Sequence, residues 1–188
     1  MALITQNGPE TLPIGSPAPF FKDLVATDGK KYGLDSFKAA TAVVISFTCN
    51  HCPYAKAYED RFIALAGEYT PKGVAFVAIN SNDPVTYPDD SFENMKARAQ
   101  EKMFPFPYLR DDLQQVARAY GAVCTPHLFV LNSNRKLTYE GRIDDNWKDP
   151  DAAKSQDLRN AIEDLLAGNP VRVPNTNPMG CSIKWKSK

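Results

Sequence analysis

The feature that most constrains the fold is a continuous apolar run at residues 42–48, AVVISFT. A run of this kind, rich in β-branched residues, predicts a strand buried on both faces of a sheet. Residues 54–69 follow with apolar side chains three and four residues apart, which predicts a helix with one buried face. A second apolar run, at residues 73–80, predicts another buried strand. Strands that alternate with helices imply a central sheet with helices on both faces, the α/β class.

The rest of the chain continues this alternation. Asp28 and Gly29 predict a hairpin within residues 20–34, and Ser91 is the expected N-cap of a helix. Further helices are expected at residues 91–102, 112–120 and 151–168, an extended edge segment at 104–111, and strands at 127–132 and 137–142. A length of 188 residues suffices for one core, so residues 1–188 are expected to form a single domain. Residues 1–19 should wrap its surface, and residues 169–188 should form an extended tail.

The composition excludes several classes of function. The chain has 22 Lys and Arg against 22 Asp and Glu, so its charge favours neither nucleic acid nor an anionic membrane as a partner. No apolar run approaches the length of a membrane span. The first 19 residues lack the basic start and apolar core of a signal peptide. We therefore expect a cytoplasmic protein without nucleic-acid or membrane partners.

Two cysteines, Cys49 and Cys52, lie where the first buried strand gives way to the helix. Unpaired backbone N–H groups at a helix start stabilise an anion. We therefore expect Cys49 to be an exposed thiol whose pKa falls from about 8.5 toward or below about 7. Cys52 should be more buried and should be its disulfide partner. His51 can stabilise a thiolate by charge or by hydrogen bonding, and Pro53 suits the first helical turn.

The same pair could instead hold a metal. A C-x-x-C motif supplies two ligands, whereas structural zinc takes four, so Cys124, Cys181, His51 or His127 would have to complete the site. A purely structural disulfide would close a very short loop and constrain the unfolded chain little. The chain has enough residues for a core and no signal sequence, so redox-active thiols without a metal or cofactor are the preferred interpretation.

A second motif, GAVCTPHLFVLN, places Thr125 and Pro126 directly before a predicted strand. A proline at this point is expected to be cis, in a tight turn. Together with four other segments, this motif makes the chain resemble the thioredoxin superfamily. The four segments are VVISFTCNHCPYAK, IGSPAPFFKDLVATDGKKYGLDSF, GVAFVAINSND and LTYEGRIDD. Within that superfamily it is most similar to the redoxin branch, which includes the cytochrome-maturation thioredoxins and the peroxiredoxins of the alkyl hydroperoxide reductase/thiol-specific antioxidant family. The resemblance covers residues 12–145 and implies a thioredoxin-like fold in which Thr125 and Pro126 face the cysteines and hold the substrate backbone.

The resemblance is compatible with two enzymatic activities. Peroxiredoxins carry T-x-x-C followed by proline; Cys52 and Pro53 fit, but Cys49 stands at the threonine position and Thr48 is one residue too early. Peroxiredoxins carry an arginine at the start of the late strand, and in this chain that position is occupied by Pro126. Thiol–disulfide exchange is therefore preferred, with Cys49 attacking and Cys52 resolving the mixed disulfide. A peroxidase that uses Cys52 or Cys49 is the alternative.

A third hypothesis, from another class, is a non-catalytic module that holds zinc or an iron–sulfur cluster through its cysteines. For the preferred activity the partners would be disulfide-containing proteins or small thiols. The electron donor, of the thioredoxin reductase or the glutathione type, is left open by the sequence.

Three further features each have two interpretations. Cys124 is either a small buried residue or an additional redox thiol. His127 is expected at the rim of its strand, with a role in tuning Cys49 as the less favoured alternative. The polar loop at residues 79–91 either lines a substrate groove, since it follows the end of a strand, or is simply solvated.

The tail carries Cys181, Ile183 and Trp185 in alternation with polar residues. A period of two predicts an extended segment with these three side chains facing inward. Cys181 is then either a packed anchor, the preferred interpretation, or a third thiol that reaches the Cys49–Cys52 pair.

Overall fold

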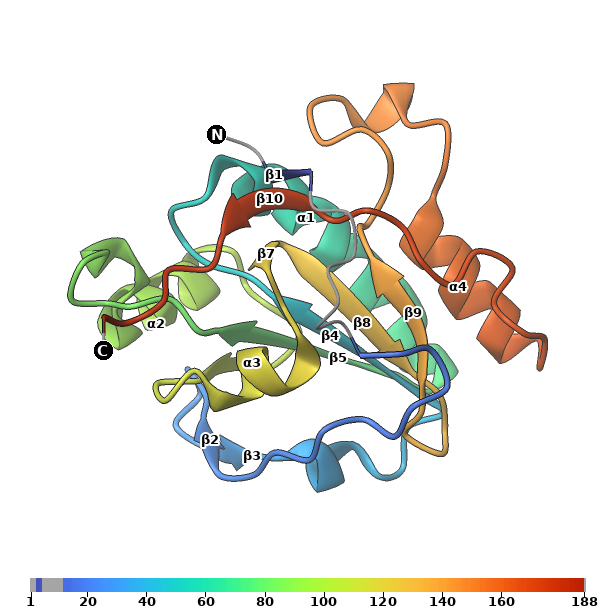
Figure 1. Cartoon of the computed structure of the whole chain (residues 1–188), viewed down its shortest axis with the longest axis horizontal. Helices are drawn as coiled ribbons and strands as arrows, with labels where there is room; N and C mark the ends of the chain where they lie inside the picture. The colour runs from blue at the N-terminus through green and yellow to red at the C-terminus, as the bar shows by residue number, and fades with distance from the viewer. Residues whose placement is uncertain (1–2, 5–11, 188) are drawn as a thin grey trace.

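The computed structural model describes residues 3–4 and 12–187. Its centre is a five-stranded sheet made of β4 (Ala42–Phe47), β5 (Val74–Asn80), β6 (Tyr108–Arg110), β8 (His127–Leu131) and β9 (Leu137–Gly141). The strand order is β6-β5-β4-β8-β9 (Figure 1). β4 pairs in parallel with β5, and β5 with β6, whereas β8 is antiparallel to both β4 and β9. The sheet is therefore mixed, and β4, which carries the cysteine motif at its end, lies in its middle.

Helices cover both faces of this sheet. They are α1 (Pro53–Tyr69), α2 (Phe92–Glu101), α3 (Gln115–Tyr120) and α4 (Asp157–Leu166), with single 3-10 turns η1 (Leu34–Phe37), η2 (Thr70–Lys72), η3 (Pro88–Asp90) and η4 (Pro150–Ala152). Apolar side chains of α1, α2 and α4 share one core, and those of α3 share the other with the hairpin of β2 (Leu24–Val25) and β3 (Lys31–Tyr32). Val44 faces the first core, whereas Val43 and Ile45 face the second. Both faces of β4 are buried, which is why its sequence is a continuous apolar run.

The expected elements agree with these bounds apart from two helices that begin later than expected. The helix expected at residues 112–120 begins at Gln115 as α3. The sequence predicts a helix over residues 151–168, but α4 begins at Asp157. The preceding residues form η4 and a loop, in which Lys154 and Ser155 donate backbone hydrogen bonds to the Asp145 carboxylate. Side-chain acceptors of this kind compete with helix formation, so the helix starts later than the propensity of its residues indicates.

A second, smaller sheet brings both ends of the chain to the cysteine motif. It consists of β1 (Leu3–Ile4), β10 (Met179–Ser182) and β7 (Cys124–Thr125), in the order β1-β10-β7 and antiparallel throughout. In Figure 1, β10 crosses beside β7 and over the start of α1. The predicted docking of the tail is therefore confirmed.

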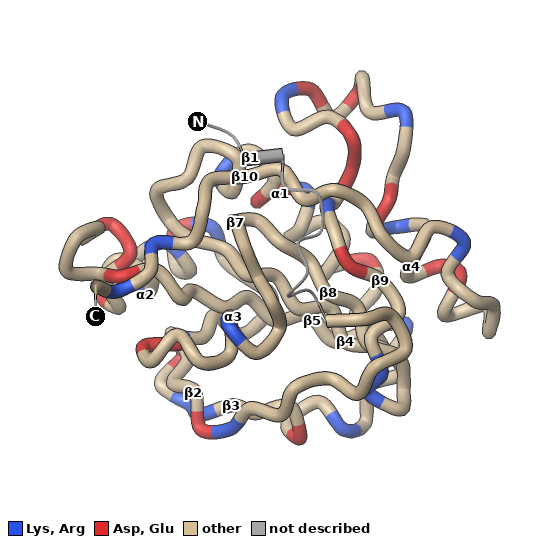
Figure 2. Tube along the Cα trace, in the orientation of Figure 1, with Lys and Arg blue, Asp and Glu red and all other residues tan. Residues whose placement is uncertain are grey.

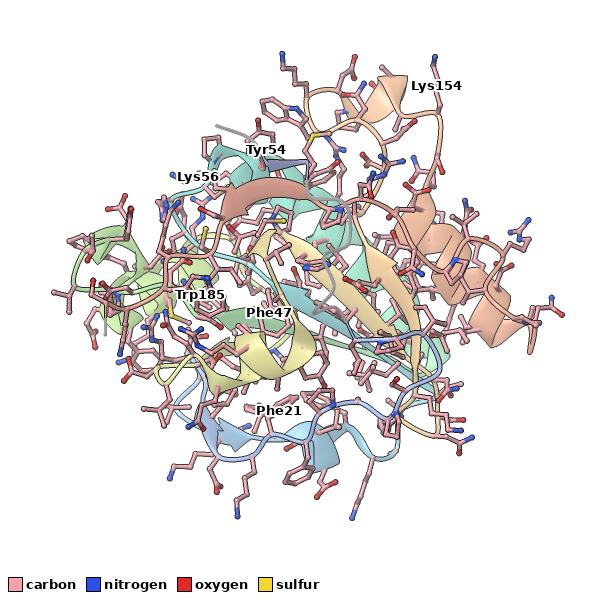
Figure 3. All side chains as sticks on the ribbon, in the orientation of Figure 1. Phe21, Phe47, Tyr54, Lys56, Lys154 and Trp185 are labelled. Atoms are coloured by element: carbon pink, nitrogen blue, oxygen red, sulfur yellow. The ribbon has the colours of Figure 1, made fainter. Side chains whose placement is uncertain are left out.

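One part of the tail prediction is wrong. Ile183 is buried with the second core, but Trp185 remains 38 % exposed (Figure 3). Trp185 lies under the guanidinium of Arg118, whose carbon is 4.2 Å from the ring centroid. The period of two ends after Ile183 because the strand itself ends at Ser182.

Charged residues of both signs are spread along the outer loops and helices of the trace (Figure 2). This distribution matches the balanced composition. Across residues 3–4 and 12–187, none of the helices combines the length and the apolar character that crossing a bilayer requires.

Candidate active site

The cysteine motif lies at the junction between β4 and α1. Cys52 is the N-cap residue of α1, and Pro53 occupies its first position, where a missing N–H leaves no hydrogen bond unmade. Cys49 lies in the connection that follows β4. Both cysteines are free thiols in this structure, and Tyr54 packs against them.

The strand before Pro126 contacts both sulfurs. The Cys49 Sγ lies 3.1 Å from Thr125 Oγ1, and the Cys52 Sγ lies 3.2 Å from the Thr125 carbonyl oxygen. The Thr125–Pro126 peptide bond is cis, as the sequence predicts. Pro126 and Cys49 also line a small apolar cavity under α1, together with Tyr58, Phe62 and other core residues. The two motifs, which lie more than seventy residues apart in the sequence, thus form one site.

The expectation that Cys49 is exposed is wrong. Cys49 is 5 % exposed and Cys52 is fully buried. Cys181 of β10 packs on the same cluster, so the docked tail closes the side that an isolated C-x-x-C motif would present to solvent. A thiol with greater exposure is Cys181 itself, which is only partly buried.

The expected position of the thiolate is also reversed. The Cys49 thiol donates to the Cys52 sulfur, and this is the largest of the effects that lower the pKa of Cys52, to about 4. The Cys181 thiol and the backbone N–H groups of Ala55 and Cys181 donate to the same sulfur. The Thr125 carbonyl favours the protonated thiol, but it is outnumbered by these donors. These donors favour negative charge on Cys52 rather than on Cys49.

Burial is the main reason that the pKa of Cys49 is raised well above its ordinary value. Its hydrogen bond to Cys52 and the negative charge of Asp90 raise the pKa further, whereas the Thr125 hydroxyl lowers it. Cys49 is therefore favoured as the protonated thiol because it is buried next to an acidic residue, whereas the backbone N–H of Ala55 in α1 donates to Cys52.

Asp90 is a functional residue that the sequence analysis did not single out. Its side chain is fully buried, and its Oδ1 accepts hydrogen bonds from the backbone N–H of Asn50 at 2.7 Å and from Asn80 Nδ2 at 3.1 Å. Its Oδ2 accepts from Asn82 Nδ2 at 2.8 Å. Asp90 belongs to the polar loop after β5, and the position of that loop beyond the carboxyl end of a buried strand was the signal for it.

Two tyrosines complete the acidic side of the site. Tyr108 is fully buried and donates to Asn50 Oδ1 at 2.9 Å, and burial together with the charges near it raises its pKa well above the ordinary value. Tyr87 stacks on His51 with ring centroids 5.1 Å apart. Neither residue could be placed at the site from spacing alone, because Tyr108 begins β6 and Tyr87 lies in the loop after β5.

The structure places His51 beside Asp90. Its Nδ1 lies 2.5 Å from Asp90 Oδ2, which makes this nitrogen the donor of the pair. A nitrogen of His51, the Cys49 sulfur and a carboxylate oxygen of Asp90 all lie within 4.8 Å of one another. His51 is therefore a hydrogen-bond partner of the carboxylate that lies next to Cys49.

These three groups are also potential metal ligands. Thiolate, imidazole and carboxylate donors suit zinc, and a catalytic zinc site takes three protein ligands. Both oxygens of Asp90 already accept two hydrogen bonds each from buried or partly buried donors, and the Cys49 thiol is the one that holds its proton. Metal binding would have to break several of these bonds, so the donor set fits proton sharing better than a preformed metal site.

Close packing within β10 and hydrogen bonds of the residues after it hold the tail against the site. Gly180 passes so close to β7 that a Cβ atom built on it would lie 2.1 Å from the Thr125 carbonyl oxygen. The backbone N–H of Lys184 donates to Asn82 Oδ1 at 2.8 Å. Gln114 accepts from the backbone N–H of Lys186 and donates to the Lys184 carbonyl, both at 2.9 Å. Cys181 is thereby held against Cys52, and the structure brings the third thiol to the site.

Two other candidates are placed as follows. Cys124 is fully buried, its sulfur lies 3.7 Å from the Pro126 carbonyl oxygen, and burial raises its pKa to about 12, so it behaves as an apolar side chain. His127 is also fully buried, which corrects its expected position at the rim. Its Nε2 lies 3.1 Å from Glu140 Oε1 of β9, although these two atoms are not aligned for a hydrogen bond. His127 is directed at β9 rather than at Cys49.

Comparisons with known proteins agree with this geometry. The Redoxin family model matches residues 13–157, which is most of the chain. The protein belongs to the redoxin family. No curated protein matches the sequence.

Solved structures extend the comparison. An uncharacterized conserved protein from Geobacillus kaustophilus is 44 % identical, with a TM-score of 0.88 and 94 % of each chain covered. The thioredoxin domain of a thiol-disulfide oxidoreductase from Bacteroides vulgatus is 19 % identical, with a TM-score of 0.63 over 83 % of this chain and 99 % of that one. Peroxidoxin BcpB from Mycobacterium tuberculosis is 20 % identical, with a TM-score of 0.60 over 82 % and 94 %. The fold is thioredoxin-like, and family and site together support a thiol-based redox function.

Proposed function

We propose that this redoxin is a thiol–disulfide oxidoreductase that cycles between a Cys49–Cys52 dithiol and the corresponding disulfide. The proposal rests above all on two free thiols that pack in one cluster and both contact Thr125, directly before the cis bond at Pro126. The interaction between the two sulfurs raises the pKa of Cys49 and lowers that of Cys52. Two thiols that share one proton are already in the ionisation state from which a disulfide forms, because a thiolate is the attacking species.

The surrounding groups act on the proton and on the geometry. The Cys52 thiolate is stabilised by the helix start, so it is a good leaving group when the disulfide is reduced. Burial and the charge of Asp90 help to keep Cys49 protonated in the reduced form, and His51 holds Asp90 in place by a hydrogen bond. Thr125 contacts both sulfurs and holds them on the same side of the β7 strand.

The test is an equilibrium titration of the protein against glutathione redox buffers, with the thiols counted by alkylation and mass spectrometry. A disulfide between the Cys49 and Cys52 peptides, formed reversibly over a physiological range of potentials, is the expected result. Cys49→Ser and Cys52→Ser should each abolish it. A wild-type protein that forms no such disulfide in any of these buffers would refute the proposal.

A peroxidase is the second candidate, and the thiolate at Cys52 favours it. A low pKa at the cysteine before Pro53 is what reaction with a peroxide requires. Complete burial of that sulfur and the thiol at the threonine position of T-x-x-C count against it. Peroxide consumption by the reduced protein, compared with that of Cys52→Ser, separates the two activities, since only a peroxidase oxidises Cys52 to a sulfenic acid.

A further inference from the structure

The site contains a thiol that the cysteine pair does not account for. Cys181 of β10 packs on the cluster that contains Cys49 and Cys52, and it pairs with Thr125, whose carbonyl oxygen lies 3.2 Å from the Cys52 sulfur. Its interaction with Cys52 lowers the pKa of Cys52 and contributes to raising its own. Three thiols therefore share one cluster. Cys124, the fourth cysteine, donates to the Pro126 carbonyl and makes no hydrogen bond to Cys52.

Exposure distinguishes Cys181 from the other two thiols of the cluster. Cys49 and Cys52 are almost or fully buried, whereas Cys181 is only partly buried. An external disulfide must bring its sulfur into line with an attacking thiolate. At the surface of the folded protein, that sulfur meets Cys181 before it meets the other two.

The edge of β7 is occupied by the same segment. Cys181 pairs with Thr125, and Ser182 pairs with Cys124, in an antiparallel ladder. A protein substrate that added its backbone to this edge would have to displace β10 first. The close approach of Gly180 to Thr125 and the hydrogen bonds of Lys184 and Lys186 oppose that displacement.

We propose that Cys181 is the thiol through which external disulfides exchange with the buried pair, and that these substrates are small-molecule disulfides rather than proteins. This inference rests on the proposed function of Cys49 and Cys52. It makes the protein a three-thiol relay in which the tail occupies the position of a bound substrate.

The steps balance as follows. The Cys181 thiol passes its proton to the Cys52 thiolate and attacks the external disulfide RS–SR, which forms a Cys181–S–S–R bond and releases RS⁻. Cys52 then attacks the Cys181 sulfur, its proton leaves with the second thiol as RSH, and a Cys52–Cys181 disulfide results. Finally Cys49 attacks Cys52, forms the Cys49–Cys52 disulfide and returns the proton to Cys181. Two electrons pass from the Cys49–Cys52 dithiol to RS–SR, which is reduced to two thiols.

The first experiment traps the middle step. Reduced Cys49→Ser protein is mixed with oxidised glutathione, quenched in acid and digested, and its disulfides are mapped by mass spectrometry. We expect a Cys52–Cys181 disulfide in this variant and only a glutathione adduct in Cys49→Ser/Cys181→Ser. A Cys49→Ser protein that ends as a glutathione adduct, without a Cys52–Cys181 bond, would overturn the relay.

The second experiment measures rates. Because a tethered thiol acts at a millimolar effective concentration, loss of Cys181 should slow oxidation of the pair by glutathione disulfide by about tenfold or more. Ser182→Ala is the matched control, since Ser182 contacts Lys184 and leaves all three thiols in place. Its rate should equal that of the wild type. An unchanged rate in Cys181→Ser would refute the relay and leave the Cys49–Cys52 function standing.

The substrate class is tested in parallel with insulin as a protein disulfide. Wild-type protein should reduce glutathione disulfide faster than insulin by about tenfold or more, because intact insulin cannot reach β7 while β10 is docked. Insulin reduction at an equal rate would overturn the small-molecule assignment. If the wild type forms no Cys49–Cys52 disulfide with either substrate, the proposed function fails together with the relay.

Discussion

Cys49 and Cys52 lie three residues apart in one motif, yet their surroundings are opposite in character. Around Cys49, burial and the nearby charge of Asp90 disfavour negative charge, and the Thr125 hydroxyl opposes them only in part. Around Cys52 the N–H groups of Ala55 and Cys181 and two thiols all donate. The comparison shows that hydrogen-bond donors, rather than the order of the two cysteines in the motif, decide which sulfur is favoured as the thiolate.

The largest effect is expected when the tail is forced off the Cys52 side. Gly180→Ala places a methyl group 2.1 Å from the Thr125 carbonyl oxygen, so β10 must separate from β7. Since the burial of Ile183 is then lost as well, the free energy of unfolding should fall by about 3–4 kcal/mol. Alkylation of Cys52 by iodoacetamide should accelerate. Chemical denaturation and timed alkylation measure the two effects.

Gly67→Ala is the matched control for this change. Gly67 lies within α1, and a Cβ atom built on it meets nothing within 4 Å. Its substitution should leave alkylation unchanged and should not destabilise the protein. Equal behaviour of the two variants would show that the tail does not cover the site.

A somewhat smaller effect is expected when the Cys49 side loses its charge. Asp90→Asn leaves His51 without a carboxylate and puts an amide NH₂ donor where a carboxylate oxygen accepts from the donors of Asn80 or Asn82, which should lower the free energy of unfolding by about 3 kcal/mol. The pKa of Cys49 should fall, because the negative charge of Asp90 raises it. Denaturation and pH-dependent alkylation of Cys49 measure both. Asp89→Asn, an exposed neighbour, should change neither.

A further effect is expected when the hydrogen bond between Cys49 and Cys52 is removed. Cys49→Ala removes the strongest hydrogen-bond donor to Cys52, so the pKa of Cys52 should rise by roughly one to two units. Thiolate absorbance near 240 nm, titrated from acid to neutral pH, measures this shift. The low-pH step should be absent from Cys52→Ser, and if it persists there the charge lies on another cysteine.

The same shift has a consequence for stability. The pKa of Cys52 is lower in the folded than in the unfolded chain, so the unfolded chain binds more protons between the two values. The stability of the reduced protein should therefore rise with pH from about 4 to about 8.5 and be lost again as the pH falls through that range. In Cys49→Ala this dependence should be weaker.

The smallest effect is expected at Thr125, which touches both sides. Thr125→Val removes the hydroxyl next to Cys49 but keeps the carbonyl next to Cys52. Because the hydroxyl lowers the pKa of Cys49, its loss should raise that pKa and slow alkylation of Cys49, with a change in stability of about 1 kcal/mol. Thr138→Val, which removes a hydroxyl bonded to the Val130 carbonyl, should not alter alkylation. A faster reaction in Thr125→Val would contradict this assignment.

The sequence was sufficient for the parts of the molecule whose pattern is local. The buried strand before the cysteines, the helix after them and the cis bond at Pro126 are encoded in runs of neighbouring residues, and all three are confirmed. The burial of Cys49 is different, because it depends on a tail that joins the site from the other end of the chain.

The position of Asp90 next to Cys49 could not be predicted from the sequence for the same reason. Asp90 is one of several acidic residues in a polar loop, and only its hydrogen bonds to Asn50, Asn80 and Asn82 distinguish it from the exposed Asp89. The helix start predicts a low pKa for a nearby thiol, but which thiol receives the donors depends on the turn between them. That turn makes Cys52 the N-cap residue and leaves Cys49 outside the helix.

Asn82 connects the two sides of the site through a single amide. Its nitrogen donates to Asp90, and its oxygen accepts the backbone N–H of Lys184 in the tail. Release of the tail removes one of the two restraints that orient this amide, and loss of its hydrogen bond to the Asp90 carboxylate removes the other. The two events are thermodynamically coupled through this side chain, and the coupling is reciprocal. If loss of the bond to Asp90 favours detachment of the tail by some factor, detachment favours loss of that bond by the same factor, so the order of the buried polar cluster and access to the thiols are linked.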